Sequence, residues 1–164
     1  MPWQDSHSSG FFPVGPPVSQ ANAGRNRWHG VGTSEPLVAS DTCAPRVLVI
    51  EDDRTVRDSI QALLEYLGYE CGLAADGPSG LRLFEGEPWD LVLTDLTLPG
   101  MSGLDVVEVI RRRAPTRPMI LITGADDPFI RSRAREHHVL LVLKPFGLDT
   151  LKAAVVDALY AQAQ

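Results

Sequence analysis

The chain has 164 residues, of which 44% are hydrophobic and 22% charged, and its formal net charge at pH 7 is −6. This composition is typical of a globular protein with one ordinary domain, and the negative balance argues against nucleic-acid binding over the whole chain. Two cysteines, Cys43 and Cys71, are too few for a disulfide framework and form no Cys-x-x-Cys pair. With no apolar run of roughly 18 residues and no secretory signal, we expect a cytoplasmic protein without membrane contact.

Residues 1–44 differ in composition from the rest of the chain. Sixteen of these 44 residues are Gly, Pro or Ser, and they show neither helical nor strand periodicity. We predict a disordered tail, followed by one domain over residues 45–164. A docking motif built on Phe11, Phe12 and the Pro16–Pro17 pair is an alternative, and so is an over-called start codon.

From residue 45 onward, short apolar runs alternate with amphipathic stretches. Strands are predicted at 46–50, 69–75, 90–94, 118–123 and 140–145, and helices at 53–68, 77–86, 102–114, 127–138 and 148–161. Five strands alternating with five helices imply parallel strands joined by right-handed crossovers. The predicted fold class is therefore a doubly wound α/β domain around a five-stranded parallel sheet.

Polar residues follow or end four of the five predicted strands. Glu51 and Asp52 follow the first strand, Asp95 the third, Thr123 ends the fourth and Lys144 lies at the end of the fifth. Each alone is explained by helix capping or strand propensity. Together they converge, because the carboxyl ends of parallel strands lie at one edge of the sheet, where doubly wound proteins bind their ligands. We expect a functional site there.

Four segments of the chain, "VLVIEDD", "DLVLTDLTLPGMSG", "ILITGA" and "LVLKPF", resemble the receiver domain of two-component response regulators. The resemblance extends over about residues 45–162. It implies the CheY-like (βα)5 fold with strand order 2-1-3-4-5. Since the sequence continues only to "QAQ" after the last predicted helix, we expect a stand-alone receiver.

The resemblance also implies a metal site. It assigns Mg²⁺ to Glu51, Asp52 and Asp95, with the backbone carbonyl of Thr97 as a further ligand. Three carboxylates at one sheet edge suit this hard cation, which retains several waters. Asp53 is one position beyond the acidic pair, and we interpret it as the N-cap of the first helix.

The same resemblance implies the chemistry. Asp95 is the expected phospho-acceptor, Thr123 the switch hydroxyl, and Lys144, before a Pro145 whose peptide bond is usually cis in the family, the phosphoryl-binding cation. The expected donor is a histidine kinase or phosphotransfer protein. The phosphoryl group then switches binding to a downstream protein or passes along a relay, without multiple enzymatic turnover.

Two features depart from the family pattern. Leu141 occupies the switch position, three residues before Lys144, where the family usually has an aromatic residue. The spacing between Thr123 and Lys144 is also about one residue shorter than in the family. These departures affect signal transmission, whereas the residues for phosphorylation are complete.

Two alternative functions follow from the same residues. A degenerate receiver would bind a partner without phosphorylation, as Leu141 mildly favours. A haloacid dehalogenase-type phosphatase also uses a strand-end Asp with Mg²⁺ and Lys, but it needs a second Asp as general acid two residues later, where this chain has Thr97.

Two further clusters are interpreted as structural. The arginines at 111–113 are predicted to form a solvated helix end that complements the helix dipole or an acidic partner, rather than a nucleic-acid contact. His137 and His138 lack a second pair of metal ligands at helical spacing.

Overall fold

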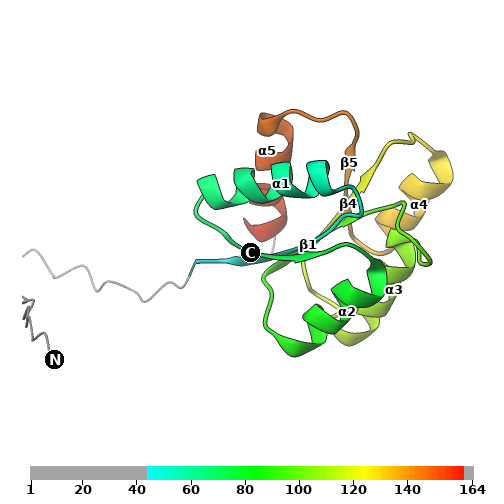
Figure 1. Cartoon of the computed structure of the whole chain (residues 1–164). Coiled ribbons are helices and arrows are strands. Elements are labelled where there is room, and N and C mark those ends of the chain that lie inside the picture. The colour runs from blue at the N-terminus through cyan, green and yellow to red at the C-terminus, as the bar shows by residue number, and fades with distance from the viewer. Residues whose placement is uncertain (1–43, 161–164) are drawn as a thin grey trace, which may run out of the picture. The chain divides into compact units, whose positions relative to one another are not determined.

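The computed structural model describes residues 44–160 of the chain (Figure 1). The predicted tail at 1–43, including Phe11, Phe12 and the Pro16–Pro17 pair, lies outside the described residues. Within the described part, strands and helices alternate strictly along the chain. The elements are β1 Arg46–Ile50, α1 Arg54–Tyr66, β2 Glu70–Ala74, α2 Gly77–Gly86, β3 Leu91–Asp95, α3 Gly103–Arg113, β4 Met119–Thr123, α4 Pro128–Glu136, β5 Leu140–Leu143 and α5 Leu148–Tyr160.

The five strands form one parallel sheet in the order β2-β1-β3-β4-β5. Asp95 at the end of β3 is in register with Ile122, and Thr123 at the end of β4 with Leu143. The register brings the carboxyl ends of the central strands to one edge of the sheet. The predicted fold class and strand order are confirmed.

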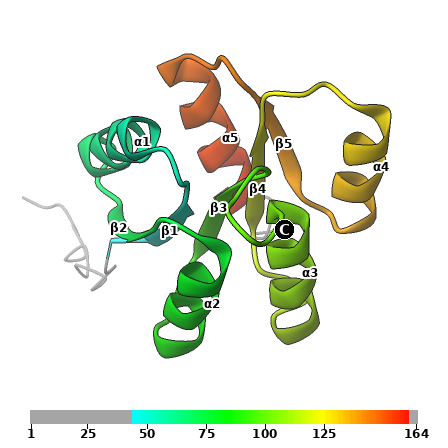
Figure 2. The same ribbon diagram turned by 45° about the vertical axis from the view of Figure 1, so that its right-hand side comes forward.

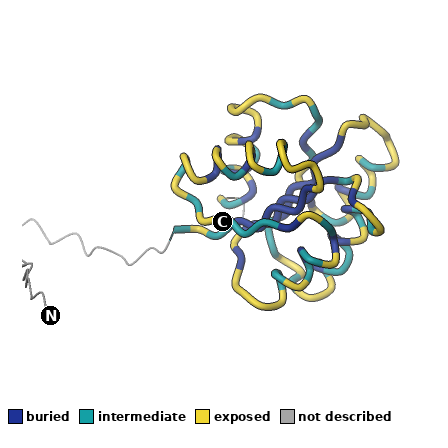
Figure 3. The backbone as a smooth tube through the Cα atoms, in the orientation of Figure 1, coloured by how far each residue is buried: buried dark blue, intermediate teal, exposed yellow. Residues whose placement is uncertain are grey.

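Alternate residues of the buried strands form two apolar layers. Val47, Val49 and Leu93 belong to the layer that α1 and α5 cover, whereas Leu48 and Ile50 belong to the layer under α2, α3 and α4. Figures 1 and 2 show these two sets of helices on opposite faces of the sheet, and Figure 3 shows the buried strands between them. Burial on both faces explains why these strands read as continuous apolar runs.

Helix ends differ from the prediction by one or two residues. Ser102, predicted inside a helix, is the N-cap of α3 and forms a capping box with Asp105. Helix α4 ends at Glu136 instead of 138, because His138 has a φ of 52° and the Val139 N–H donates to the Ala134 carbonyl. Across residues 44–160, no helix combines the length and apolarity that crossing a membrane requires.

Cys71 on β2 should be a slowly reacting thiol. Burial, with a smaller contribution from the charge of Glu65, raises the pKa of its thiol to about 11. In a Cys43→Ser variant, we expect alkylation by iodoacetamide at pH 8 to be roughly 100-fold slower than for a free cysteine, because the thiolate is the nucleophile. The rate should rise about tenfold per pH unit and level off near pH 11. A rate that levels off near pH 8.5 would contradict this prediction.

Candidate functional site

Three carboxylates meet at the carboxyl edge of the sheet. Carboxylate oxygens of Glu51, Asp52 and Asp95 all lie within 4.8 Å of one another. Glu51 and Asp95 are buried, with 1% and 5% of their surface exposed, while Asp52 is exposed to solvent. The structure therefore brings together the three acids that the sequence predicted as a cluster.

Lys144 is the positively charged partner of this cluster. Its Nζ lies 2.7 Å from Oδ1 of Asp95 and 2.9 Å from Oε2 of Glu51. Its backbone N–H donates to the Thr123 carbonyl at 2.7 Å, which continues the ladder of β4 and β5 beyond the last strand residue. The Lys144–Pro145 peptide bond is cis, as expected.

The pKa shifts at the site reflect crowding of negative charge. Burial, together with the nearby charge of Asp95, raises the pKa of Glu51, and the contacts with Lys144 offset this only in part. Burial opposes the charge on Lys144, but hydrogen bonds and attraction to Asp95 and Glu51 raise its pKa overall. At neutral pH this lysine is a fixed cation at the centre of the site.

The site fits a divalent cation. When all three carboxylates are ionised, they and the one ammonium group leave a net charge of −2 at a partly open edge. A hard cation with oxygen ligands, such as Mg²⁺, neutralises this charge, and exposed Asp52 leaves room for its waters. The residues that would hold it are Glu51, Asp52 and Asp95.

Local contacts fix the position of Asp95. Its Oδ2 accepts a hydrogen bond from the Thr97 N–H at 2.8 Å, while Oδ1 faces Lys144. The carbonyl of Asp95 packs directly against Gly103 at the start of α3. The expected role of the Thr97 carbonyl as a metal ligand stays a prediction.

The turn after β1 is held by an arginine that the sequence analysis did not identify. Nη1 of Arg57 donates to the Glu51 carbonyl at 2.5 Å and to the Asp52 carbonyl at 3.3 Å. These bonds fix the backbone that presents both acids. The sequence offered one indication of this role: Arg57 is four residues after the helix cap Asp53, a position from which its side chain turns back toward the preceding loop.

Asp53 is a helix cap, as predicted. Its Oδ1 accepts hydrogen bonds from the N–H groups of Thr55 at 2.7 Å and Val56 at 3.1 Å. The φ of Gly68 is 87°, and this glycine follows the C-cap of the same helix. The acidic run therefore divides into two site residues and one cap.

Among the described residues, the side chains of Thr123 and Leu141 form no hydrogen bond with the three carboxylates. Thr123 is buried, and its hydroxyl exchanges hydrogen bonds with Ala125, accepting from its N–H at 3.1 Å. Leu141 is half-buried and packs against the apolar layer that includes Ala134 and Ile130 of α4. Any switching role for these two residues stays a prediction.

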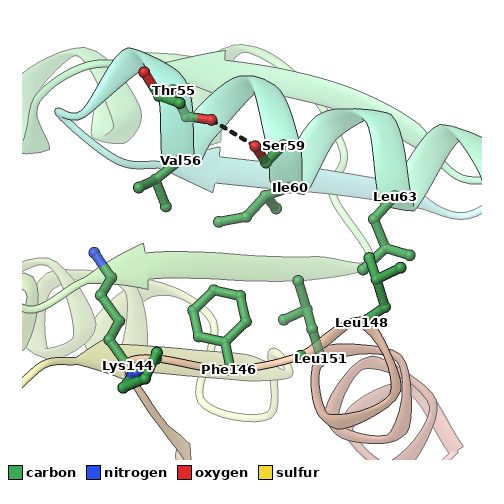
Figure 4. Close-up of a pocket in the computed structure, with 11 residues that line it drawn as sticks. Thr55, Val56, Ser59, Ile60, Leu63, Lys144, Phe146, Leu148 and Leu151 are labelled. Atoms are coloured by element: carbon green, nitrogen blue, oxygen red, sulfur yellow. Dashed lines mark hydrogen bonds between the residues drawn. The ribbon is translucent and has the colours of Figure 1, made fainter.

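A groove of about 540 Å³ adjoins the site between α1 and the first turn of α5 (Figure 4). Lys144 lies at one end of it, and the walls are mainly apolar. Among its lining residues are Val56, Ile60, Leu63, Phe146, Leu148 and Leu151. The side chain of Leu148 is largely exposed. The charged site therefore borders an apolar surface.

Gly103 should tolerate no side chain. A Cβ built there would lie 2.1 Å from the Asp95 carbonyl oxygen, and backbone cannot move aside without displacing β3. We expect Gly103→Ala to lower the free energy of unfolding by about 2–3 kcal/mol. Urea unfolding would measure this loss. Gly86→Ala is the matched control because nothing lies within 4 Å of its Cβ position, and equal losses in the two variants would refute the prediction.

The fold and site together define a doubly wound α/β protein with an acidic, lysine-paired site at the carboxyl edge of its sheet. The family model of the response regulator receiver domain matches residues 47–156. The chain belongs to this family, the receiver domains of two-component systems.

Known relatives agree with this assignment. The sensory transduction protein RegX3 of Mycolicibacterium smegmatis is 44% identical over 80 residues, covering 49% of this chain and 35% of that protein. The transcriptional regulatory protein DltR of Streptococcus agalactiae is 35% identical over 111 residues, covering 67% of this chain and 50% of its own length. The chain thus spans half or less of the length of these relatives.

Solved receiver domains show the same fold. A CheY-like receiver domain protein from Methanospirillum hungatei superposes with a TM-score of 0.71 at 28% identity, covering 74% of this chain and 98% of that one. A receiver domain protein from Clostridium thermocellum gives a TM-score of 0.68 at 30% identity, covering 73% and 97%.

Proposed function

We propose that this receiver domain accepts a phosphoryl group on Asp95 in a Mg²⁺-dependent reaction, from a phosphohistidine of a histidine kinase or phosphotransfer protein. The observation that carries the proposal is the contact of Lys144 with both Asp95 and Glu51 inside a cluster of three carboxylates. Because Lys144 already lies beside the acceptor carboxylate, its positive charge can stabilise the negative charge of an incoming phosphoryl group.

In the proposed reaction a carboxylate oxygen of Asp95 attacks phosphorus. The new bond is an acyl phosphate. The phosphorus–nitrogen bond breaks with its electron pair going to nitrogen, and the donor ring, which carries a proton on its other nitrogen, leaves as neutral imidazole. Lys144 moves its hydrogen bond from the carboxylate to a phosphoryl oxygen, and Thr123 turns its hydroxyl from Ala125 toward another. Mg²⁺, which Glu51, Asp52 and Asp95 would hold, would neutralise negative charge during the transfer.

We also propose that the chain does not act as a multiple-turnover phosphatase. A dehalogenase-type enzyme needs a general acid two residues after its nucleophile, and Thr97 has no carboxyl group for this role. The proposed product is therefore a phosphoprotein, which acts in the cytoplasm on a downstream protein or a relay.

Leu141 supports a second candidate, a receiver that binds its partner without phosphorylation. Its aliphatic side chain is half-buried against α4 and has no ring or polar tip to respond to the acyl phosphate. In this candidate the surface around α4 and β5 is the same whether or not Asp95 carries a phosphoryl group.

Phosphoryl uptake from acetyl phosphate tests the proposal. The full chain with Mg²⁺ should gain the mass of one phosphoryl group, and the same chain with EDTA should not. Peptide mapping after borohydride reduction should place the modification at Asp95. An intact, folded chain that remains unmodified with Mg²⁺ would favour the phosphorylation-independent candidate, and steady release of inorganic phosphate from phosphomonoesters would favour the phosphatase.

A further inference from the structure

Two of the three acids in the site lie on the turn between β1 and α1 rather than within a strand. The N–H of Glu51 donates to the Ala74 carbonyl at 3.1 Å, which continues the pairing of β1 with β2 by one residue. Asp52 comes next, is exposed, and directly precedes the helix cap Asp53. Asp95, by contrast, is itself a residue of β3. The arrangement of the metal site therefore depends on what holds this turn.

The side chain of Arg57 bonds the backbone of both acids. Its Nη1 donates to the carbonyl of Glu51 at 2.5 Å and to that of Asp52 at 3.3 Å. The backbone N–H of Arg57 donates to the Asp53 carbonyl at 2.9 Å, so the residue is anchored in the first turn of α1. Its side chain is half-buried. One arginine thus ties the start of the helix to the two residues that present carboxylates.

Arg57 differs in its contacts from the other cation near the site. Lys144 contacts the carboxylates of Glu51 and Asp95 directly. Between residues 44 and 160, the hydrogen bonds of the Arg57 side chain go to backbone carbonyls, and it forms no ion pair with a carboxylate. The contribution of Arg57 to the site is therefore to its geometry rather than to neutralisation of the acids.

The charge of Arg57 and its hydrogen bonds have opposite effects on a bound cation. The positive charge repels Mg²⁺, so removal of this charge alone would strengthen Mg²⁺ binding. The hydrogen bonds hold the ligand-bearing turn in place before the metal arrives, so their removal would weaken binding. Solvent and salt screen the repulsion to an effect of about a few-fold, whereas loss of a residue that orients metal ligands typically weakens binding about 10–100-fold. The hydrogen bonds decide the sign.

We propose that Arg57 is a positioning residue for the metal site, which holds Glu51 and Asp52 in the arrangement that binds Mg²⁺ by bonding their carbonyls. This inference rests on the proposed Mg²⁺-dependent function and adds a residue to its site. Mg²⁺ requires near-ideal octahedral geometry, and a displaced ligand therefore lowers its affinity steeply.

The Mg²⁺ affinity of the unphosphorylated full chain tests the proposal. Titration with MgCl₂, followed through the backbone amide resonances of Glu51 and Asp52, gives the Kd without any phosphoryl transfer. In Arg57→Met, which retains an unbranched apolar stem but has no N–H donors, the Kd should rise about tenfold. Arg57→Lys should raise it only about threefold, because its ammonium group is a donor on a stem one bond shorter.

Arg54→Met is the matched control for the loss of charge. Arg54 is the first residue of α1, is exposed, and forms an ion pair with Asp58. Its removal should leave the Kd for Mg²⁺ within about twofold of the wild-type value. The amide spectrum reports the folding of each variant, so a loss of affinity in a folded chain is not a loss of stability.

The outcomes separate this inference from the proposed function. Mg²⁺ binding at wild-type affinity or tighter in folded Arg57→Met, or an equal loss in Arg54→Met, would overturn the role of Arg57 even if the wild-type chain takes up a phosphoryl group normally. A wild-type chain that binds Mg²⁺ but is not phosphorylated would contradict the proposed function, and the Kd of Arg57→Met would still decide the role of Arg57. A wild-type chain that binds no Mg²⁺ would overturn both.

Discussion

Replacement of Asp95 by asparagine should abolish phosphoryl uptake from acetyl phosphate, with a loss of at least about 1,000-fold in rate. Asparagine retains the shape of the side chain and an oxygen that can accept from the Thr97 N–H, but its amide is not a nucleophile. The fold should persist, because the substitution removes one negative charge from a crowded cluster. Intact-protein mass spectrometry with a time course would measure the loss.

The control for this variant is Asp58→Asn, which removes an exposed carboxylate from α1, where Asp58 forms an ion pair with Arg54. It should take up the phosphoryl group at the wild-type rate. If Asp95→Asn were still modified at a comparable rate, the acceptor would be another residue, and peptide mapping would identify it. In that case the site geometry would need a different chemical interpretation.

Much of the fold was predictable because its signals are local or periodic. Apolar runs such as 46–50 and 119–123 are buried on both faces, and Asp53 and Asp127 cap the helices that follow them. The convergence of Glu51, Asp95 and Lys144 also followed from strand ends alone, since a parallel sheet puts its carboxyl ends at one edge.

Contacts between segments that only the folded structure brings together could not be predicted from the sequence. Arg57 bonds two carbonyls of the preceding loop, and Gly103 is required because the Asp95 carbonyl lies against it. Neither contact has a periodic signature. Arg111 was predicted to be an ordinary solvated cation, and only the packing of α3 against the chain before β4 shows that its Nε is buried. Helix α4 ends where His138 adopts a positive φ. A histidine in the sequence does not predict this conformation, which is typical of glycine and asparagine.

Asp52 and Asp53 are adjacent in the sequence, but their substitution should affect Mg²⁺ binding very differently. Asp52→Asn should weaken Mg²⁺ binding about 100-fold, because it removes a full negative charge within 4.8 Å of the other two carboxylates. The Mg²⁺ concentration that gives half of the maximal phosphorylation rate should rise by the same factor. Asp53→Asn should leave Mg²⁺ affinity within about twofold, because asparagine caps a helix as well as aspartate does, and Thr55 and Val56 keep their acceptor. Titration of the phosphoryl-uptake rate against Mg²⁺ concentration measures both variants side by side.

If Asp53→Asn weakened Mg²⁺ binding more than Asp52→Asn, the metal ligand would be Asp53 rather than Asp52. This result would also mean that Asp53 leaves its capping position when the metal binds, since one carboxylate oxygen now accepts both helix N–H groups.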